Sequence, residues 1–215
     1  MLKRSLILLL GSIFAMAACA AETPNEKFKE GIDYGVLPKA VATDVANKVE
    51  VIEFFYYGCP HCYHFEPHIQ SLRKTMPTTA VFKAVPATFS DEWKKAARAY
   101  YALESLGALD KTHKPIFEAI HKHNKKLSSP ESFADVVAAQ GVDRKAFLDA
   151  MNAFNTDSKV NKASQLVMLY QVSGVPMLAV NGRYIVTGEL AKSPERMIEI
   201  TRFLINKEAK RMDLK

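Results

Sequence analysis

The chain has 215 residues, of which 48% are hydrophobic, and it contains no low-complexity segment or internal repeat. This composition excludes a repeat or low-complexity protein, and it allows one large globular domain or a small domain that carries an insertion. The formal net charge is +6, the basic residues are scattered apart from the tail at 207–215, and no nucleic-acid-binding motif is present. We therefore expect a globular protein that does not bind nucleic acid.

Residues 1–21 have the pattern of a secretory signal peptide. Two basic residues precede the apolar run 6–14, and small residues follow as far as Ala21. The apolar run is too short for a comfortable membrane span, which favours a signal that is cut after Ala20 or Ala21. A bacterial lipoprotein signal, with Cys19 acylated at the inner membrane, is the minor alternative. In both cases we expect the rest of the chain to be exported.

The mature chain begins with a loose arm over residues 22–48, which contains one short strand near 34–37. Residues 48–56 form the first central strand, because their β-branched and aromatic side chains are typical of a strand buried on both faces. Glu53 interrupts this strand, and a buried carboxylate is costly unless it has a partner or a role. We consider two interpretations: an edge position or salt bridge, and a proton acceptor for the Cys62 thiol whose pKa is raised by desolvation.

Two cysteines follow this strand, in the motif Cys59-Pro60-His61-Cys62. The strand ends at Gly58 and a helical pattern covers 63–76, so Cys59 lies where the helix begins. Unpaired N–H groups and the helix dipole stabilise a thiolate there and lower its pKa. Pro60 suits the first helical position, and a protonated His61 would favour the thiolate further. Such stabilisation makes a disulfide between the two thiols more oxidising.

A zinc site and a structural disulfide are the alternatives for this motif. A closed zinc site needs four ligands, usually with a second Cys/His pair, and only His64 and His68 follow nearby. A disulfide across two residues constrains little of the chain. Removal of the signal peptide leaves Cys59 and Cys62 as the only cysteines, which is not the pattern of a stapled exported protein. The motif therefore indicates redox chemistry, for which we expect no metal and no diffusible cofactor.

The next strand covers 80–85 and contains Lys83. We expect this lysine either to pair with Glu66 or Glu53 near the thiols or to be a solvated edge residue. From residue 91 to residue 172 the pattern is helical throughout. The predicted helices cover 91–106, 114–122, 130–141, 143–154 and 157–172. The sequence from Ser128 to Glu131 predicts a capping box at the start of the third of these helices.

The strand pattern then resumes. Residues 177–180 and 184–187 are predicted strands, joined by a hairpin turn at Asn181-Gly182, and a C-terminal amphipathic helix opens at Ser193. Pro176 precedes the first of these strands. From the local sequence alone, its peptide bond is expected to be trans.

These motifs together resemble the DsbA family of periplasmic thiol:disulfide oxidoreductases, in the thioredoxin superfamily. The resemblance covers about residues 25–210 and rests on Glu53–Phe55, on the Cys-Pro-His-Cys motif with Tyr63, Phe65 and Glu66, and on Gly174–Pro176 and Val180–Tyr184. It implies an α/β structure: a thioredoxin fold with an inserted all-helical domain. The boundaries we assign are a signal peptide at 1–21, a thioredoxin-like domain at 22–88 and 174–215, and the helical domain at 89–173.

The resemblance also implies roles for single residues. It makes Cys59 the exposed nucleophile and Cys62 the buried resolving thiol. The family's proline at the position of Pro176 is cis and packs against the disulfide, and Val175 before it offers its backbone to a substrate peptide as an added strand. Glu53 matches the family's buried acid near the second cysteine. The catalytic residues assigned in this way are Cys59, Cys62, His61, Pro60, Glu53 and Pro176, and the substrate-binding residues are Val175, Pro176 and His61; Glu66 and Lys83 match charged neighbours.

The function implied is that of a dithiol oxidase of the periplasm. Its substrates would be reduced, unfolded, exported polypeptides, and a DsbB-type inner-membrane quinone reductase would reoxidise it. We expect a monomer. Two other classes remain open on the same fold: a disulfide isomerase or reductase, and a non-enzymatic peptide-binding protein.

Two departures from the family pattern concern the substrate groove. Gly58 stands where many members have a bulky residue, and the stretch 85–87 also differs. Trp93, near the start of the helical insertion, is expected either to pack at the domain boundary or to be a plain core or surface aromatic.

Overall fold

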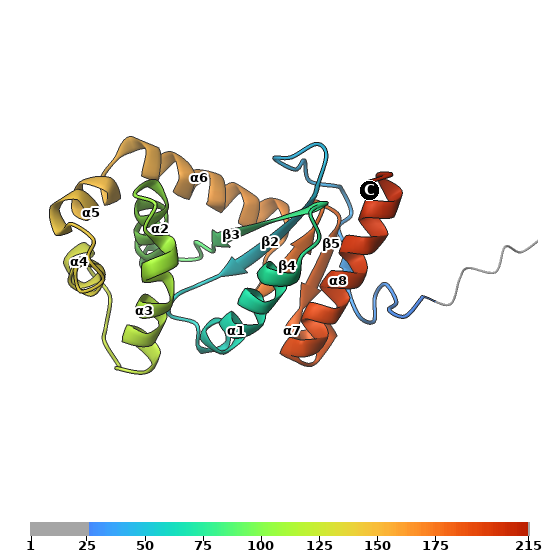
Figure 1. Cartoon of the computed structure of the whole chain (residues 1–215), viewed down its shortest axis with the longest axis horizontal. Coiled ribbons are helices and arrows are strands. Elements are labelled where there is room, and N and C mark those ends of the chain that lie inside the picture. The colour runs from blue at the N-terminus through green and yellow to red at the C-terminus, as the bar shows by residue number, and fades with distance from the viewer. Residues whose placement is uncertain (1–25, 215) are drawn as a thin grey trace, which may run out of the picture.

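The computed structural model describes residues 26–214, so the predicted signal peptide and Cys19 lie outside the described residues. Five strands form one mixed sheet in the order β1-β5-β4-β2-β3 (Figure 1). They are β1 (Gly35–Val36), β2 (Val49–Phe55), β3 (Ala80–Pro86), β4 (Met177–Val180) and β5 (Tyr184–Thr187). Strands β2 and β3 are parallel, and the other pairs are antiparallel. The parallel pair requires a crossover connection, which helix α1 (Pro60–Thr75) supplies.

One face of the sheet is covered by α1 and by α8 (Pro194–Arg211). Alternate residues of β2, Val49 and Val51, pack there with the apolar side of α1, including Phe65 and Ile69. Because side chains alternate along a strand, Glu53 belongs to this same face and is directed toward α1. The short helix α7 (Gly188–Ala191) links β5 to α8.

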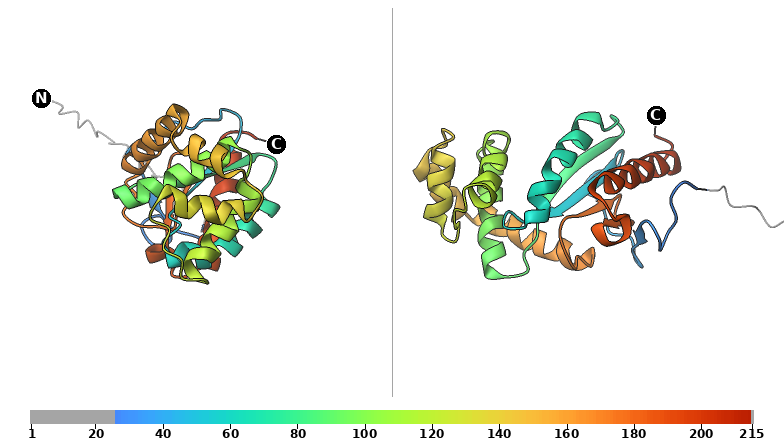
Figure 2. Two further views of the ribbon diagram at one scale, coloured as in Figure 1. Left: turned by 90° about the vertical axis from the view of Figure 1, so that its left-hand side faces the viewer. Right: turned by 90° about the horizontal axis from the view of Figure 1, so that it is seen from below.

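Five helices lie between β3 and β4 in the chain. They are α2 (Asp91–Ser105), α3 (Leu109–His121), α4 (Pro130–Ala138), α5 (Arg144–Met151) and α6 (Phe154–Leu169). Helices α2 to α5 gather at one end of the molecule, and α6 leads back to the sheet (Figures 1 and 2). The residue after α6, Tyr170, packs on Phe54 of β2 with ring centroids 5.3 Å apart. The chain thus has a thioredoxin-type sheet interrupted by a helical insertion, as the sequence predicts.

Several helix limits differ from the sequence-based expectation. Helix α3 begins at Leu109 rather than at residue 114, because burial of Thr112 and Ile116 holds its first turns against the core although Pro115 lies inside the helix. The capping box predicted from Ser128 to Glu131 is wrong: Ser129 and Ser132 form it, since Pro130 occupies the first helical position. The short helix α7 was not predicted at all.

The Asn181-Gly182 turn is confirmed between β4 and β5. Both residues have positive φ, 50° and 64°, as this hairpin type requires. Within residues 26–214, no helix is long and apolar enough to cross a lipid bilayer.

Candidate active site

Cys59 is the N-cap residue of α1, and Pro60 is its first helical residue. The chain turns tightly before the helix, because the Cys59 amide donates a 3.0 Å hydrogen bond to the carbonyl of Tyr56. Cys59 is partly exposed, whereas Cys62, one turn further along α1, is buried at 1% exposure. Both cysteines are free thiols in the structure. The motif therefore presents one accessible sulfur with a second, hidden sulfur behind it.

The two thiols differ strongly in acidity. The pKa of Cys59 is lowered from 9.0 to about 5, and the largest cause is a hydrogen bond from the Cys62 thiol. Burial, the next largest effect, opposes this shift. Hydrogen bonds from the backbone N–H groups of Cys62 and His61, and from the His61 side chain, lower the pKa further. Burial, more than the hydrogen bond and charge of Cys59, raises the pKa of Cys62. The sequence suggested the helix terminus and His61 as the cause, but the partner thiol contributes more than either.

Glu53 lies in the middle of β2, paired in register with Ala84 of β3 and Leu178 of β4. The edge-strand interpretation is therefore wrong, because strands flank β2 on both sides. The side chain is 3% exposed. Burial raises its pKa well above the usual range, and the charge of Glu66 adds to that effect. A negative charge on Glu53 in turn disfavours a Cys62 thiolate.

The loop before β4 faces the start of α1. The Val175–Pro176 peptide bond is cis, as the resemblance implies and against the local preference for trans. The Cys59 thiol donates a hydrogen bond of 3.5 Å to the carbonyl of Val175. A cavity of about 550 Å³ lies beside this contact, and its lining includes Val175, Pro176, His61 and His64. Tertiary folding thus brings together two segments that are 116 residues apart in sequence.

Lys83 does not contact the thiol site, so its expected pairing with Glu53 or Glu66 is wrong. Its ammonium group lies 2.7 Å from Asp44, in a cluster that also holds Lys162. The side chains of β3 alternate between faces, which turns Lys83 away from α1 toward the N-terminal arm. Among residues 26–214 no group of His, Cys, Asp and Glu side chains is arranged to hold a metal ion.

An aromatic stack beside Cys59 was not expected from the sequence. Tyr56 lies flat on Trp93, with ring centroids 3.9 Å apart and an interplanar angle of 10°. Phe89 packs on the same tryptophan at 4.8 Å. Trp93 therefore packs across the boundary between sheet and insertion, which confirms the first of the two interpretations for this residue.

Gly58 makes room for that stack, and its replacement gives a first prediction. A Cβ atom at position 58 would lie 2.5 Å from the Tyr56 ring, closer than real carbon contacts allow. We expect Gly58→Ala to push Tyr56 off Trp93 and to cost about 1–3 kcal/mol of unfolding free energy, as overpacking does. Trp93 is the chain's single tryptophan, so its fluorescence reports the change directly. Unchanged fluorescence emission together with unchanged stability would contradict the prediction. Gly174→Ala is the control, because a Cβ atom at position 174 meets no atom within 4 Å.

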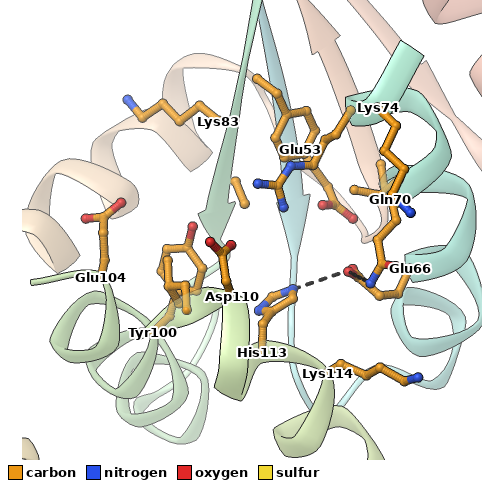
Figure 3. A pocket seen from close by; sticks show the side chains of 15 residues that line it. Glu53, Glu66, Gln70, Lys74, Lys83, Tyr100, Glu104, Asp110, His113 and Lys114 are labelled. Carbon is orange, nitrogen blue, oxygen red and sulfur yellow. Dashed lines mark hydrogen bonds and ion pairs between the residues drawn. The ribbon is translucent and has the colours of Figure 1, made fainter. Parts of the chain in front are cut away.

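Helix α3 brings two further histidines to the site. His121 donates a hydrogen bond of 2.7 Å to the carbonyl of Tyr57, and His113 Nδ1 lies 2.8 Å from the Tyr57 hydroxyl. The other nitrogen of His113 lies 3.5 Å from the Glu66 carboxylate (Figure 3). Sequence reasoning missed both histidines, although their spacing of eight residues with Phe117 between them places all three on one helix face.

The comparisons with known proteins agree with this geometry. The family model described as a DSBA-like thioredoxin domain matches residues 69–196. The chain is 40% identical over 197 residues to the thiol:disulfide interchange protein DsbA of Azotobacter vinelandii, which covers 92% of each chain. It is 40% identical over 202 residues to the protein of the same name from Pseudomonas aeruginosa, covering 94% of this chain and 93% of that protein.

Solved structures give the same result. The crystal structure of Pseudomonas aeruginosa DsbA superimposes with a TM-score of 0.83 at 39% identity, covering 86% of this chain and 97% of that one. A DsbA1 oxidoreductase of Neisseria meningitidis superimposes with a TM-score of 0.76 at 27% identity, covering 86% and 96%. With the paired cysteines at the start of α1, these similarities show that the chain belongs to the DsbA family and is a thiol:disulfide oxidoreductase.

Proposed function

We propose that this protein is an oxidant that donates its Cys59–Cys62 disulfide to newly exported polypeptides. The observation that carries the proposal is the low pKa of Cys59, about 5, next to a Cys62 whose pKa is raised by burial. Reduction of the disulfide releases Cys59 as a stabilised thiolate. A disulfide whose reduced form is stabilised in this way is easily reduced, and therefore oxidises other thiols.

The proposed reaction has two steps. A substrate thiolate attacks Cys59 Sγ, the Cys59–Cys62 bond breaks, and Cys62 leaves with the electron pair and takes up a proton. A second substrate thiol then loses its proton and attacks the substrate sulfur of the mixed disulfide, and Cys59 leaves as a thiolate. The substrate gains a disulfide and loses two electrons, which the enzyme holds as a thiolate and a thiol.

We assign the other residues of the site as follows. Pro60 begins the helix whose N–H groups face Cys59, and His61 supplies a further hydrogen bond to its sulfur. Glu53 exchanges a proton with Cys62. The Val175–Pro176 segment, in contact with Cys59, receives the substrate peptide as an added strand next to the cavity of about 550 Å³.

The compartment and partners belong to the same proposal. The signal-like segment 1–21 supports export to the periplasm, with a lipoprotein attached through Cys19 as the alternative. A DsbB-type quinone reductase of the inner membrane is the proposed reoxidant. We also propose that the protein acts as a monomer. The proposed division, 22–88 and 174–215 around 89–173, is supported by the placement of α2 to α6 between β3 and β4.

An equilibrium titration of the purified protein against reduced and oxidised glutathione tests this function. We expect a reduction potential well above that of a thioredoxin, with thiolate absorbance that titrates at a pH of about 5. A thioredoxin-like potential with a Cys59 pKa near 9 would instead support a reductase or isomerase.

The same pKa shift predicts how stability depends on pH. The Cys59 pKa is lower in the folded reduced protein than in the unfolded chain, about 5 against 9, so its contribution is complete above pH 9 and is lost as the pH falls to about 5. The oxidised protein has no Cys59 thiol to titrate. We therefore expect denaturant titrations to show the reduced form gaining stability relative to the oxidised form from pH 5 to pH 9.

A further inference from the structure

A second cavity, of about 610 Å³, lies on the far side of α1 from the substrate loop, between α1, β3, α2 and α3 (Figure 3). Glu53 and Glu66 both line it, and so does His113. Its outer part is lined by exposed charged residues, which are Lys74, Glu104, Asp110 and Lys114. Solvent therefore approaches the buried Glu53 through this cavity, on the side of α1 away from the substrate-binding loop.

Proton exchange at Glu53 needs such an approach. When Cys62 leaves the disulfide it must take up a proton, because burial raises its pKa strongly. Cys62 is 1% exposed and has no direct access to water. If Glu53 supplies that proton, Glu53 must recover one before the next turnover, and every reverse reaction must return one to the solvent.

His113 is held in position for this exchange. Its Nδ1 is 2.8 Å from the Tyr57 hydroxyl, and Tyr57 is buried, which leaves Nε2 directed at Glu66 Oε2 at 3.5 Å. Imidazole is the side chain that ordinarily gains and loses a proton near neutral pH. Other titratable and charged groups come from each element that borders the cavity. Glu53 belongs to β2 and Tyr57 to the loop after it, whereas Glu66, Arg73 and Lys74 belong to α1. The others are Lys83 of β3, Tyr100 and Glu104 of α2, and Asp110 and Lys114 of α3 itself.

We propose that His113 is a positioning residue of the redox reaction. His113 passes the proton that Glu53 exchanges with solvent, and Glu66 carries that proton between His113 and Glu53. In the direction of substrate oxidation, His113 Nε2 takes a proton from cavity water and passes it to Glu66. Glu66 passes it to Glu53, and Glu53 has already given its own proton to the Cys62 thiolate. The helical insertion, through α3, thereby takes part in the chemistry of the thioredoxin-like domain. This inference rests on the proposed role of Glu53.

The test isolates the step in which Cys62 loses its proton. A mixed disulfide between Cys59 and glutathione is prepared, and the release of glutathione by attack of Cys62 is followed by stopped flow across a range of pH. We expect His113→Ala to slow this release about tenfold, less than the roughly 10²–10⁴-fold effect of a group that transfers the proton directly. Added imidazole should restore the rate, because the cavity is open to solvent and the substitution leaves space for the ring.

Three further variants separate the possible outcomes. His113→Gln keeps a polar side chain near Glu66 but cannot pass on a proton, so we expect a slow rate with parent-like thermal unfolding. His123→Gln, at an exposed histidine just after the end of α3, is the matched control and should keep the parent rate and pH profile. Glu53→Gln should slow release at least as much as His113→Ala.

Each contrary result has a distinct meaning. A parent-like rate in His113→Gln, or an absence of rescue by imidazole in His113→Ala, overturns the inference about His113 while the oxidase function stands. A parent-like rate in Glu53→Gln overturns the role of Glu53 and, with it, that of His113. The glutathione equilibrium described above is measured separately, so failure of the oxidase function is recognised independently.

Discussion

Replacement of Cys59 by serine is expected to reduce the oxidation of a reduced, unfolded polypeptide to the uncatalysed background. The reason is that Cys59 is the accessible sulfur of the pair, since Cys62 is 1% exposed and cannot meet a substrate thiol. The variant also cannot form the Cys59–Cys62 disulfide, so it carries no oxidising equivalents. The measurement is the recovery of activity by a reduced model protein whose function depends on its disulfides.

Cys62→Ala is the matched variant, and it should behave differently. Cys59 keeps its place at the start of α1 and should form a mixed disulfide with oxidised glutathione, which then persists because no second thiol resolves it. Mass spectrometry detects that adduct. The hydrogen bond from Cys62 is the largest contribution to the low pKa of Cys59, so we also expect that pKa to rise in this variant. A Cys59 pKa unchanged from about 5 would show that the helix terminus and His61 suffice.

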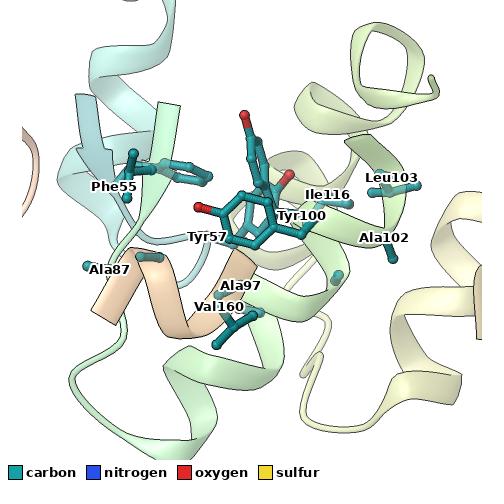
Figure 4. Packing of buried hydrophobic residues seen from close by; sticks show 14 of the residues in the cluster. Phe55, Tyr57, Ala87, Ala97, Tyr100, Ala102, Leu103, Ile116 and Val160 are labelled. Atoms are coloured by element: carbon teal, nitrogen blue, oxygen red, sulfur yellow. The ribbon is translucent and has the colours of Figure 1, made fainter. Parts of the chain in front are cut away.

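Truncation of Phe55 should have the largest effect on stability. Phe55 ends β2 and is 1% exposed, and its ring lies 5.3 Å from each of three rings, those of Tyr57, Tyr100 and His113. Figure 4 shows it beside Tyr57 and Tyr100, where the sheet meets the inserted helices. We expect Phe55→Ala to lower the free energy of unfolding by about 3–5 kcal/mol, because it removes buried apolar surface and leaves a cavity.

Urea titration of the oxidised protein measures this effect, and Phe154 provides the control. Phe154 is the first residue of α6 and is 85% exposed, so Phe154→Ala should change stability by about 0.5 kcal/mol or less. A loss below about 1 kcal/mol in Phe55→Ala would contradict the view that this aromatic cluster joins the sheet to the insertion.

Much of the site could be predicted from the sequence because its signals are local. The start of α1 at Cys59 follows from a strand that ends at Gly58 and from Pro60, which suits a first helical position because no N–H is needed there. The hairpin at Asn181-Gly182 depends on two residues that tolerate positive φ. The burial of Glu53 was apparent from the apolar residues on both sides of it in β2.

Other features depend on which distant segments meet, and only the tertiary structure decided them. Lys83 was expected to pair with Glu53 or Glu66 or to be a solvated edge residue. It does lie on the edge strand β3, and the N-terminal arm supplies its partner, Asp44, in an exposed ion pair. The contact between Cys59 and Val175 joins residues 116 apart, and that between Tyr57 and His113 joins residues 56 apart. Local sequence patterns determine where a helix or turn begins, whereas the partner of a buried polar side chain is set by the packing of whole elements, which no short stretch of sequence encodes.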